Sequence, residues 1–186
     1  FDLGGSSGLL ETRVAVLKSY AHNHQVAQKL GWEVLYFTEG RINRTEVYRP
    51  ALVTVELDFS RPQLTGVEYE ITASANSYDI AIKSMESPVY YNYALQTSES
   101  LGKELTGSEL EGTYSYGAWI EGTFGKFRVV KGLLSEDASN NVIYFSLQSY
   151  RAIAENYMEA VTIDFDSKSK SSLLKISLEG SIKPKI

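Results

Sequence analysis

The chain has 186 residues, no cysteine and a net charge of −5, and 43% of its residues are hydrophobic. This length predicts one domain, or two small ones, with a hydrophobic core of its own. The missing cysteines exclude disulfides and zinc–thiolate sites, and the acidic balance argues against nucleic-acid binding. No apolar run approaches the roughly 20 residues that a membrane helix needs. The first residue is Phe1 rather than Met, so we expect the chain to be part of a longer protein.

The N-terminal region predicts two short helices, or one helix with a kink, after a flexible lead-in over residues 1–8. The apolar residues that share one helical face are Leu10, Val14, Leu17 and Ala21. The helical register changes near Ser19, whose hydroxyl is suited to cap a second helix. That helix runs to Leu30, because Gly31 can adopt the left-handed conformation that ends a helix.

The middle of the chain is rich in alternating apolar and polar residues, which is typical of half-buried strands. The predicted strands cover residues 33–37, 52–59, 67–71, 78–82, 127–130 and 142–147. Turn residues at 74–77 join two of these strands into a hairpin. Residues 97–105 are expected to form a short helix.

The C-terminal region predicts a helix followed by two strands. Ser149 stands at an N-cap position, and the helical stripe comprises Tyr150, Ile153, Ala154, Tyr157 and Val161. Strands follow over residues 161–165 and 174–178. We therefore expect an α+β fold with a mostly antiparallel sheet, short N-terminal helices, a helix before the last two strands and a β-rich insertion in the middle.

The sequence offers no catalytic residue, metal site or cofactor motif that its spacing supports. Gly4, Ser6 and Gly8 match a nucleophile-elbow pattern, but only three residues precede them, where a strand is required. His22 and His24 would point away from each other on a helix, so they could not share a metal. We expect a protein that binds or assembles rather than an enzyme.

Two groups of residues are candidate contacts. An aromatic cluster follows Pro88, and amphipathic rings of this kind can stack on sugars or pack as a satellite of the core. The candidate glycan contacts are Tyr90, Tyr91, Tyr93 and Trp119. The C-terminal lysines either form a solvated strand face or contact a polyanion or an anionic membrane. These lysines are Lys168, Lys170, Lys183 and Lys185.

Several stretches resemble the periplasmic chain-length-determinant region of bacterial polysaccharide co-polymerases. The chain is most similar to the group of co-polymerases in which this region is fused to a cytoplasmic tyrosine kinase, as found in Bacteroides-like bacteria. The N-terminal stretches are residues 9–11, 16–19, 26–27, 30–31, 36–40 and 45–48. The C-terminal stretches are residues 150–157 and 171–179. In this comparison residues 1–59 and 142–186 form a family-like base, and residues 60–141 form a variable β-rich insertion.

The resemblance implies a single periplasmic domain, anchored in the inner membrane by transmembrane helices outside this fragment. One long helix would begin beyond Pro184. The implied function is non-catalytic: homo-oligomers would govern the chain length and export of a capsule or exopolysaccharide, together with the polymerase and export machinery. The polysaccharide itself is a further partner, and no cofactor or nucleic acid is implied. The alternative function is an extracellular carbohydrate-binding module with an aromatic platform.

Overall fold

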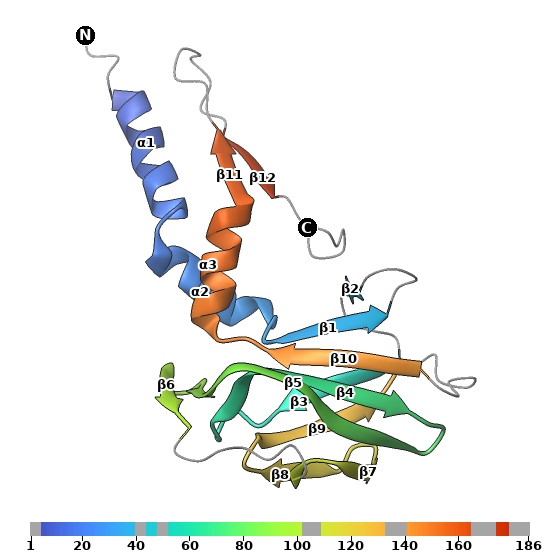
Figure 1. The fold of residues 1–186 in the computed structure, drawn as a ribbon. Coiled ribbons are helices and arrows are strands. Elements are labelled where there is room, and N and C mark those ends of the chain that lie inside the picture. The colour runs from blue at the N-terminus through green and yellow to red at the C-terminus, as the bar shows by residue number, and fades with distance from the viewer. Residues whose placement is uncertain are drawn as a thin grey trace. The chain divides into compact units, whose positions relative to one another are not determined.

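The computed structural model describes residues 5–39, 44–47, 52–101, 109–132, 141–164 and 174–178 (Figure 1). The chain divides into two compact units. The helical unit comprises Phe1–Gly31 with Tyr150–Ile186, and the β unit comprises Trp32–Ser149. The strand pairs within the described residues are antiparallel, so the predicted α+β class with a helix before the last two strands is confirmed.

Two helices separated by a cap open the helical unit. They are α1 (Gly5–Leu17) and α2 (Tyr20–Leu30). The backbone N–H of His22 donates to the Ser19 hydroxyl at 3.3 Å, and Gly31 ends α2 with φ 64°, so the predicted cap and stop are both confirmed. The predicted lead-in is wrong for residues 5–8, which belong to α1. A glycine inside a helix lowers helix stability by only about 1 kcal/mol relative to alanine. The other residues of the turn can offset this loss, so Gly5 and Gly8 do not prevent the helix from forming.

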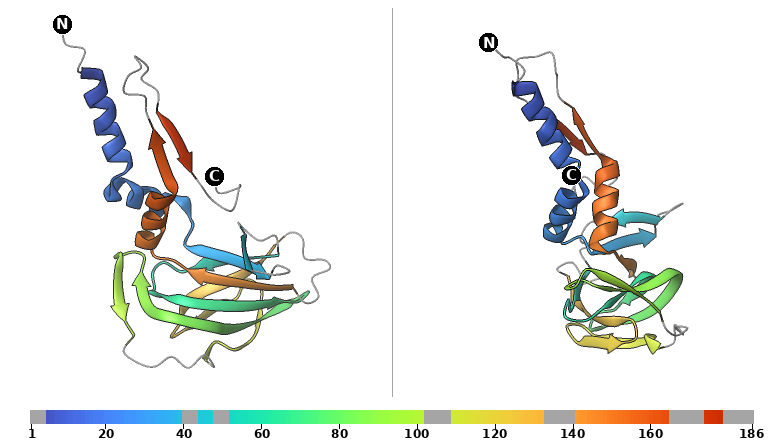
Figure 2. Two further views of the ribbon diagram at one scale, coloured as in Figure 1. Left: turned by 45° about the horizontal axis from the view of Figure 1, so that its top comes forward. Right: turned by 90° about the vertical axis from the view of Figure 1, so that its left-hand side faces the viewer.

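The second half of the helical unit follows its prediction, except that Val161, counted both in the helical stripe and in the first strand, belongs to the strand. Helix α3 (Tyr150–Ala160) packs against α2 and buries Tyr150, Ile153 and Ala154. Strands β11 (Val161–Asp164) and β12 (Lys175–Leu178) then pair with each other (Figure 2). The apolar stripe of α3 therefore forms the contact that joins the two halves of this unit, which are far apart in the sequence.

A seven-stranded antiparallel sheet forms the larger layer of the β unit. Its order is β2-β1-β10-β4-β5-β6, and β7 pairs with another part of β5. The central strands are β1 (Val34–Glu39), β10 (Asn141–Leu147), β4 (Gln63–Ala73) and β5 (Ser77–Asn92). The outer strands are β2 (Arg44–Val47), β6 (Thr97–Ser100) and β7 (Gly112–Ser115). The predicted hairpin turn between β4 and β5 is confirmed by a bond from the Ser74 N–H to the Ser77 carbonyl.

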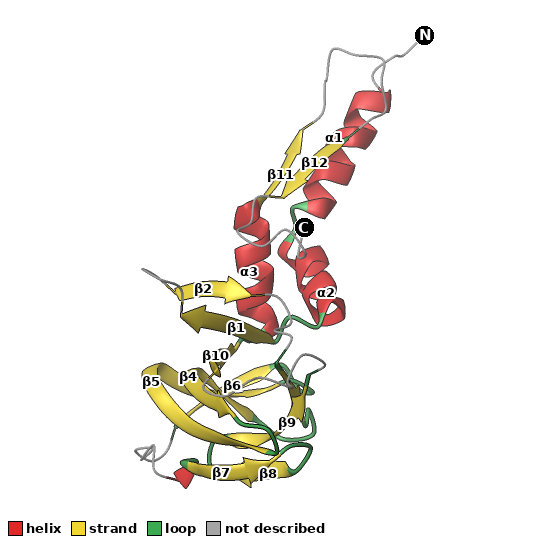
Figure 3. Ribbon diagram, turned by 90° about the vertical axis from the view of Figure 1, so that its right-hand side faces the viewer, coloured by secondary structure: helices red, strands yellow, loops and turns green. Residues whose placement is uncertain are grey.

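A three-stranded sheet, β3-β9-β8, faces the larger one (Figure 3). Its strands are β3 (Val53–Leu57), β9 (Gly125–Lys131) and β8 (Trp119–Gly122). Alternation along each strand points one set of side chains inward, where Tyr69 stacks on Phe145 at 4.6 Å between ring centroids and contacts Phe127 at 5.8 Å. The hydroxyl of Tyr36 accepts the N–H of Val55 at 2.8 Å and links the two sheets.

The helix predicted over residues 97–105 is wrong for residues 97–100, and residues 102–105 lie outside the described ranges. Thr97–Ser100 form strand β6, which pairs with β5 from Val89 to Asn92. The Asn92 side chain accepts the N–H groups of Ala94 and Leu95 and closes the turn before β6. Pairing with the neighbouring strand therefore prevails over a weak local helix preference. Within the described residues, no helix is long and apolar enough to cross a membrane.

Gly66 occupies a register shift between β4 and β5 that only a glycine fits. Its φ is +72°, and a Cβ atom at this position would lie 2.6 Å from the carbonyl oxygen of Glu86 and 2.8 Å from that of Ser87. Both obstacles are backbone atoms, so a side chain could not displace them without moving a strand.

Gly66→Ala is expected to destabilise the β unit by roughly 2–4 kcal/mol, because it adds backbone strain to a steric clash. Urea unfolding followed by tryptophan fluorescence measures this loss, since Trp32 and Trp119 both lie in the β unit. Gly112→Ala is the matched control: its Cβ atom would meet Tyr114 at an ordinary 3.5 Å, and we expect a change within about 0.5 kcal/mol. Equal stabilities for the two variants would contradict this account of Gly66.

Candidate functional site

The hairpin of β8 and β9 presents a tryptophan between charged side chains. Because side chains alternate along a strand, Trp119 and Glu121 share the outer face of β8, while Ile120 is buried between them. The register places Trp119 opposite Arg128 and Glu121 opposite Lys126. The outer face of this hairpin therefore carries one aromatic ring and three charged groups.

Two cations of β9 hold the indole ring of Trp119. The Cζ atom of Arg128 lies 4.8 Å from the ring centroid, and the Nζ atom of Lys126 lies 5.7 Å from it. Arg128 is held in turn by Glu56 of β3, with 2.6 Å between Nη2 and Oε2. The Trp119 residue is still 45% exposed. The cations thus fix the ring in place and leave part of it open to a ligand.

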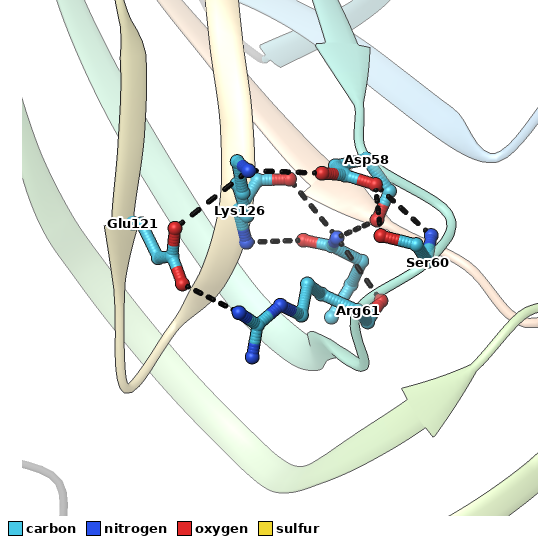
Figure 4. A network of polar contacts seen from close by, with 6 residues as sticks. Asp58, Ser60, Arg61, Glu121 and Lys126 are labelled. Atoms are coloured by element: carbon cyan, nitrogen blue, oxygen red, sulfur yellow. Dashed lines mark hydrogen bonds and ion pairs between the residues drawn. The ribbon is translucent and has the colours of Figure 1, made fainter.

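A chain of ion pairs continues from Lys126 toward Arg61 (Figure 4). The Nζ atom of Lys126 lies 3.1 Å from Oδ2 of Asp58 and 3.7 Å from Oε2 of Glu121. The Nη2 atom of Arg61 lies 3.3 Å from Oε1 of Glu121. Positive and negative groups therefore alternate along this surface, with donors and acceptors side by side.

Hydrogen bonds from Ser60 lower the pKa of Asp58 to about 2. The Ser60 hydroxyl donates to Oδ1 of Asp58 at 2.6 Å and the Ser60 N–H donates to it at 3.0 Å, and Lys126 adds a smaller effect of the same sign. Asp58 is consequently ionised at neutral pH. It acts here as an ion-pair partner, not as a proton donor.

The buried side chain of Gln63 holds the backbone beneath these charges. Its Nε2 atom donates to the carbonyls of Asp58 at 2.8 Å, Arg61 at 3.2 Å and Lys126 at 3.0 Å. Its Oε1 atom accepts the N–H of Lys126 at 3.0 Å. Gly125 has φ +112°, and a Cβ atom there would lie 2.3 Å from Oε1 of Gln63. The glycine therefore gives the carboxamide room to reach β9.

A hollow of about 240 Å³ adjoins the ion pairs. It is lined by Arg61, Pro62, Tyr90, Glu99, Glu121, Gly122, Thr123 and Gly125. The Tyr90 hydroxyl donates to the Thr123 carbonyl at 2.6 Å, and burial, with a smaller effect from Glu109, raises the Tyr90 pKa. The hollow is smaller than the roughly 300 Å³ at which pockets for drug-sized ligands begin, so it suits a small group or one unit of a larger ligand.

The structure separates the four aromatic residues that the sequence suggested as glycan contacts. Tyr91 and Tyr93 are each only 3% exposed and contact each other edge to face at 4.7 Å. The Tyr93 hydroxyl also donates to the Gln148 carbonyl at 2.6 Å. These two rings are packed inside the β unit, whereas Tyr90 lines the hollow and Trp119 lies on the outer face of β8.

The other candidate residues do not add to this site. Lys168, Lys170, Lys183 and Lys185 lie outside the described residues. His22 and His24 are on α2, where His24 contacts the rings of Tyr20 and Tyr150. No group of three or more metal-ligating His, Cys, Asp or Glu side chains occurs in the part of the chain that the structure describes.

Sequence reasoning missed most of this site because its residues come from two segments that are far apart in the chain. Asp58 and Arg61 lie in the loop between β3 and β4, and Glu121 with Lys126 belongs to the β8–β9 hairpin. One signal was present: Gly122 and Gly125 flank a short turn between alternating stretches, which is typical of a hairpin. A hairpin centred there places Trp119 beside the cations of the next strand.

Comparison of the sequence with protein-family models gives no match, and comparison with curated proteins gives none either.

Gln63→Leu is expected to destabilise the β unit by about 3 kcal/mol, because it removes four hydrogen bonds of a fully buried side chain and leaves the partly buried Lys126 N–H without its acceptor. Urea unfolding followed by tryptophan fluorescence measures the change. Thr97→Val, which also replaces a polar group by an apolar one but on the exposed strand β6, should change stability by less than about 0.5 kcal/mol. A Gln63→Leu protein as stable as the parent would refute the assigned role of this side chain.

Asp58→Asn should lower stability at neutral pH and cease to matter in acid. Because folding lowers the Asp58 pKa from 3.8 to about 2, its stabilising effect is complete above pH 4 and is lost as the pH falls toward 2. The measurement is the difference in urea midpoint between the parent and the variant across this range. Ser60→Ala, which removes the strongest hydrogen bond to the carboxylate, should move the acid loss to higher pH. A pH-independent difference for Asp58→Asn would contradict the assignment.

Proposed function

We propose that this chain is the non-catalytic periplasmic module of a capsule or exopolysaccharide assembly protein. In this proposal, homo-oligomers govern polymer chain length and export at the periplasmic face of the inner membrane. Transmembrane helices outside the fragment would anchor the module, and a cytoplasmic tyrosine kinase domain would belong to the same full-length protein. The partners would be further copies of the protein and the polymerase and export machinery.

The observation that carries the proposal is that segments from both ends of the chain form the helical unit. Residues from both sides of the β unit fold together there, because α2 packs against α3. The chain thus leaves this unit after Gly31 and returns to it at Tyr150, with the β unit inserted between. A domain held between two membrane helices needs its N-terminal and C-terminal parts close together, and a unit built from both parts is consistent with that need.

The stretches that resemble chain-length determinants fall largely in the helical unit. Within the described residues these are 9–11, 16–19, 26–27, 30–31, 150–157 and 174–178. The stretches 36–39 and 45–47 belong to the first strands of the β unit. This distribution supports the proposal, since a shared base with a variable insertion predicts that family-like residues gather in one unit.

An apolar stripe on α1 is where we expect copies of the protein to meet. Leu9 and Val16 are seven residues apart, which places them on the same face of the helix, and each is 53% exposed. Burying these two side chains against another copy would remove their apolar surface from water, which is why we place the contact here.

The test uses the full-length gene in its own host. Deletion is expected to change the length distribution of the surface polysaccharide, and the parent gene should restore it. The double variant Leu9→Glu with Val16→Glu should reduce cross-linked oligomers and fail to restore the distribution, because it places charge within the proposed contact. Lys18→Glu, which adds a negative charge in the exposed turn just after α1, is the matched control and should behave as the parent does.

Membrane fractionation and immunoblots accompany each strain, so that a loss of protein is distinguished from a loss of assembly. A polysaccharide distribution that does not respond to deletion would exclude the length-control function. Full-length protein that does not fractionate with the membrane would exclude the anchored topology.

A further inference from the structure

We propose that the outer face of the β8–β9 hairpin and the adjoining hollow form a binding site for a neutral oligosaccharide. The site comprises Trp119, Glu121, Arg61 and the hollow beside Tyr90. This inference rests on the proposed function, because it names the polysaccharide as a ligand of the β unit. The aromatic residue that carries it is Trp119, and the buried Tyr91 and Tyr93 have no part in it.

Trp119 supplies a fixed apolar surface for stacking. One ring face of a hexose bears mainly C–H groups, and a flat aromatic ring covers such a face without leaving polar groups unpaired. Arg128 and Lys126 already hold the indole from β9, so little side-chain freedom remains to be lost when a ligand binds. Trp119 is also 45% exposed, so a ligand can reach it.

Arg61 and Glu121 supply paired hydrogen-bonding groups next to the ring. A sugar hydroxyl both donates and accepts hydrogen bonds. The guanidinium of Arg61 and the carboxylate of Glu121 present a donor and an acceptor 3.3 Å apart, and their side chains are 59% and 51% exposed. Glu121 is also held by Lys126. Neighbouring hydroxyls can therefore bond to both groups at once.

The charge of the surface favours a neutral ligand over an acidic one. The cations of the site are Arg61, Lys126 and Arg128, and the carboxylates are Glu56, Asp58, Glu99 and Glu121. Each cation is paired with at least one carboxylate, so no positive charge is left to attract an anion. An acidic saccharide would meet net negative charge.

The spacing of the groups favours more than one sugar unit. Trp119 and Glu121 are two residues apart on one strand face, a separation of roughly 6.6 Å along the strand. The hollow of about 240 Å³ begins at Glu121 and extends past Tyr90. One unit would stack on the indole while the next occupies the hollow, so oligosaccharides should bind more tightly than a monosaccharide.

The experiment titrates the 186-residue chain carrying Trp32→Phe, which leaves Trp119 as its sole tryptophan. The Trp32 carbonyl that accepts a bond from Gln148 is unaffected by this change. The probes are maltohexaose, cellohexaose, laminarihexaose and mannohexaose as neutral ligands, hexagalacturonic acid as the acidic one, and glucose as the monomer. We expect a saturable change in Trp119 emission with at least one neutral hexamer. Hexagalacturonic acid and glucose should both bind more weakly than that hexamer.

Calorimetry with the neutral hexamer that binds then separates the contributions of the side chains. Trp119→Ala should weaken binding by about tenfold or more, as is common for a tryptophan anchor. Glu121→Gln and Arg61→Gln should each weaken it several-fold. Lys83→Gln, which alters an exposed ion pair with Glu70 elsewhere in the β unit, should leave binding unchanged. Thermal unfolding by circular dichroism checks that each variant is folded.

Three results would overturn the inference: no saturable binding of any neutral hexamer, tighter binding of hexagalacturonic acid, or undiminished affinity after Trp119→Ala. These results are separable from failure of the proposed function. If the site fails while gene deletion still alters polymer length, the assembly function stands without this ligand site. If the site binds and deletion has no effect, the chain is a saccharide-binding module with another function.

Discussion

The buried carboxamide of Gln63 is the interaction on which the β unit and its surface site depend. It connects the segment after β3 with the start of β9, and it belongs itself to the first residue of β4. Backbone N–H and carbonyl groups that are removed from water where segments meet need hydrogen-bond partners. Here the single side chain of Gln63 is the partner of several such groups. Asp58, Arg61 and Lys126 are therefore brought to one surface by bonds to their backbone.

The same arrangement holds the side chains of the site in place, although the site lies neither on a helix nor in a deep pocket. Its ring and three of its charges come from a tight hairpin, whose cross-strand pairs fix their spacing. The ion pairs are partly exposed, so each contributes little to stability. Their effect is to hold side chains in one geometry, which lowers the entropy that a ligand would otherwise lose on binding.

Local patterns predicted the elements whose determinants lie within a few residues. Ser19 and Gly31 bound α2 because a cap bond and a left-handed glycine act on the nearest turn. The apolar stripe of α3 and the alternation of apolar and polar residues in β11 and β12 likewise predicted these elements. The segment at residues 97–100 was misread, because its strand conformation is set by pairing with β5 and not by its own composition.

The sequence by itself determined the α+β class, the boundaries of α2 and the hairpin of β4 and β5, since each follows from periodicity, capping or turn chemistry. Only the tertiary structure decided which aromatic residues are available to a ligand. Tyr90, Tyr91 and Tyr93 are close in the sequence, yet packing against Phe59 and a bond to Gln148 remove Tyr93 from the surface, and Tyr91 is buried with it. Trp119 remains exposed because it lies on the outer face of a sheet whose inner face fills the core, a distinction that depends on residues distant in the sequence.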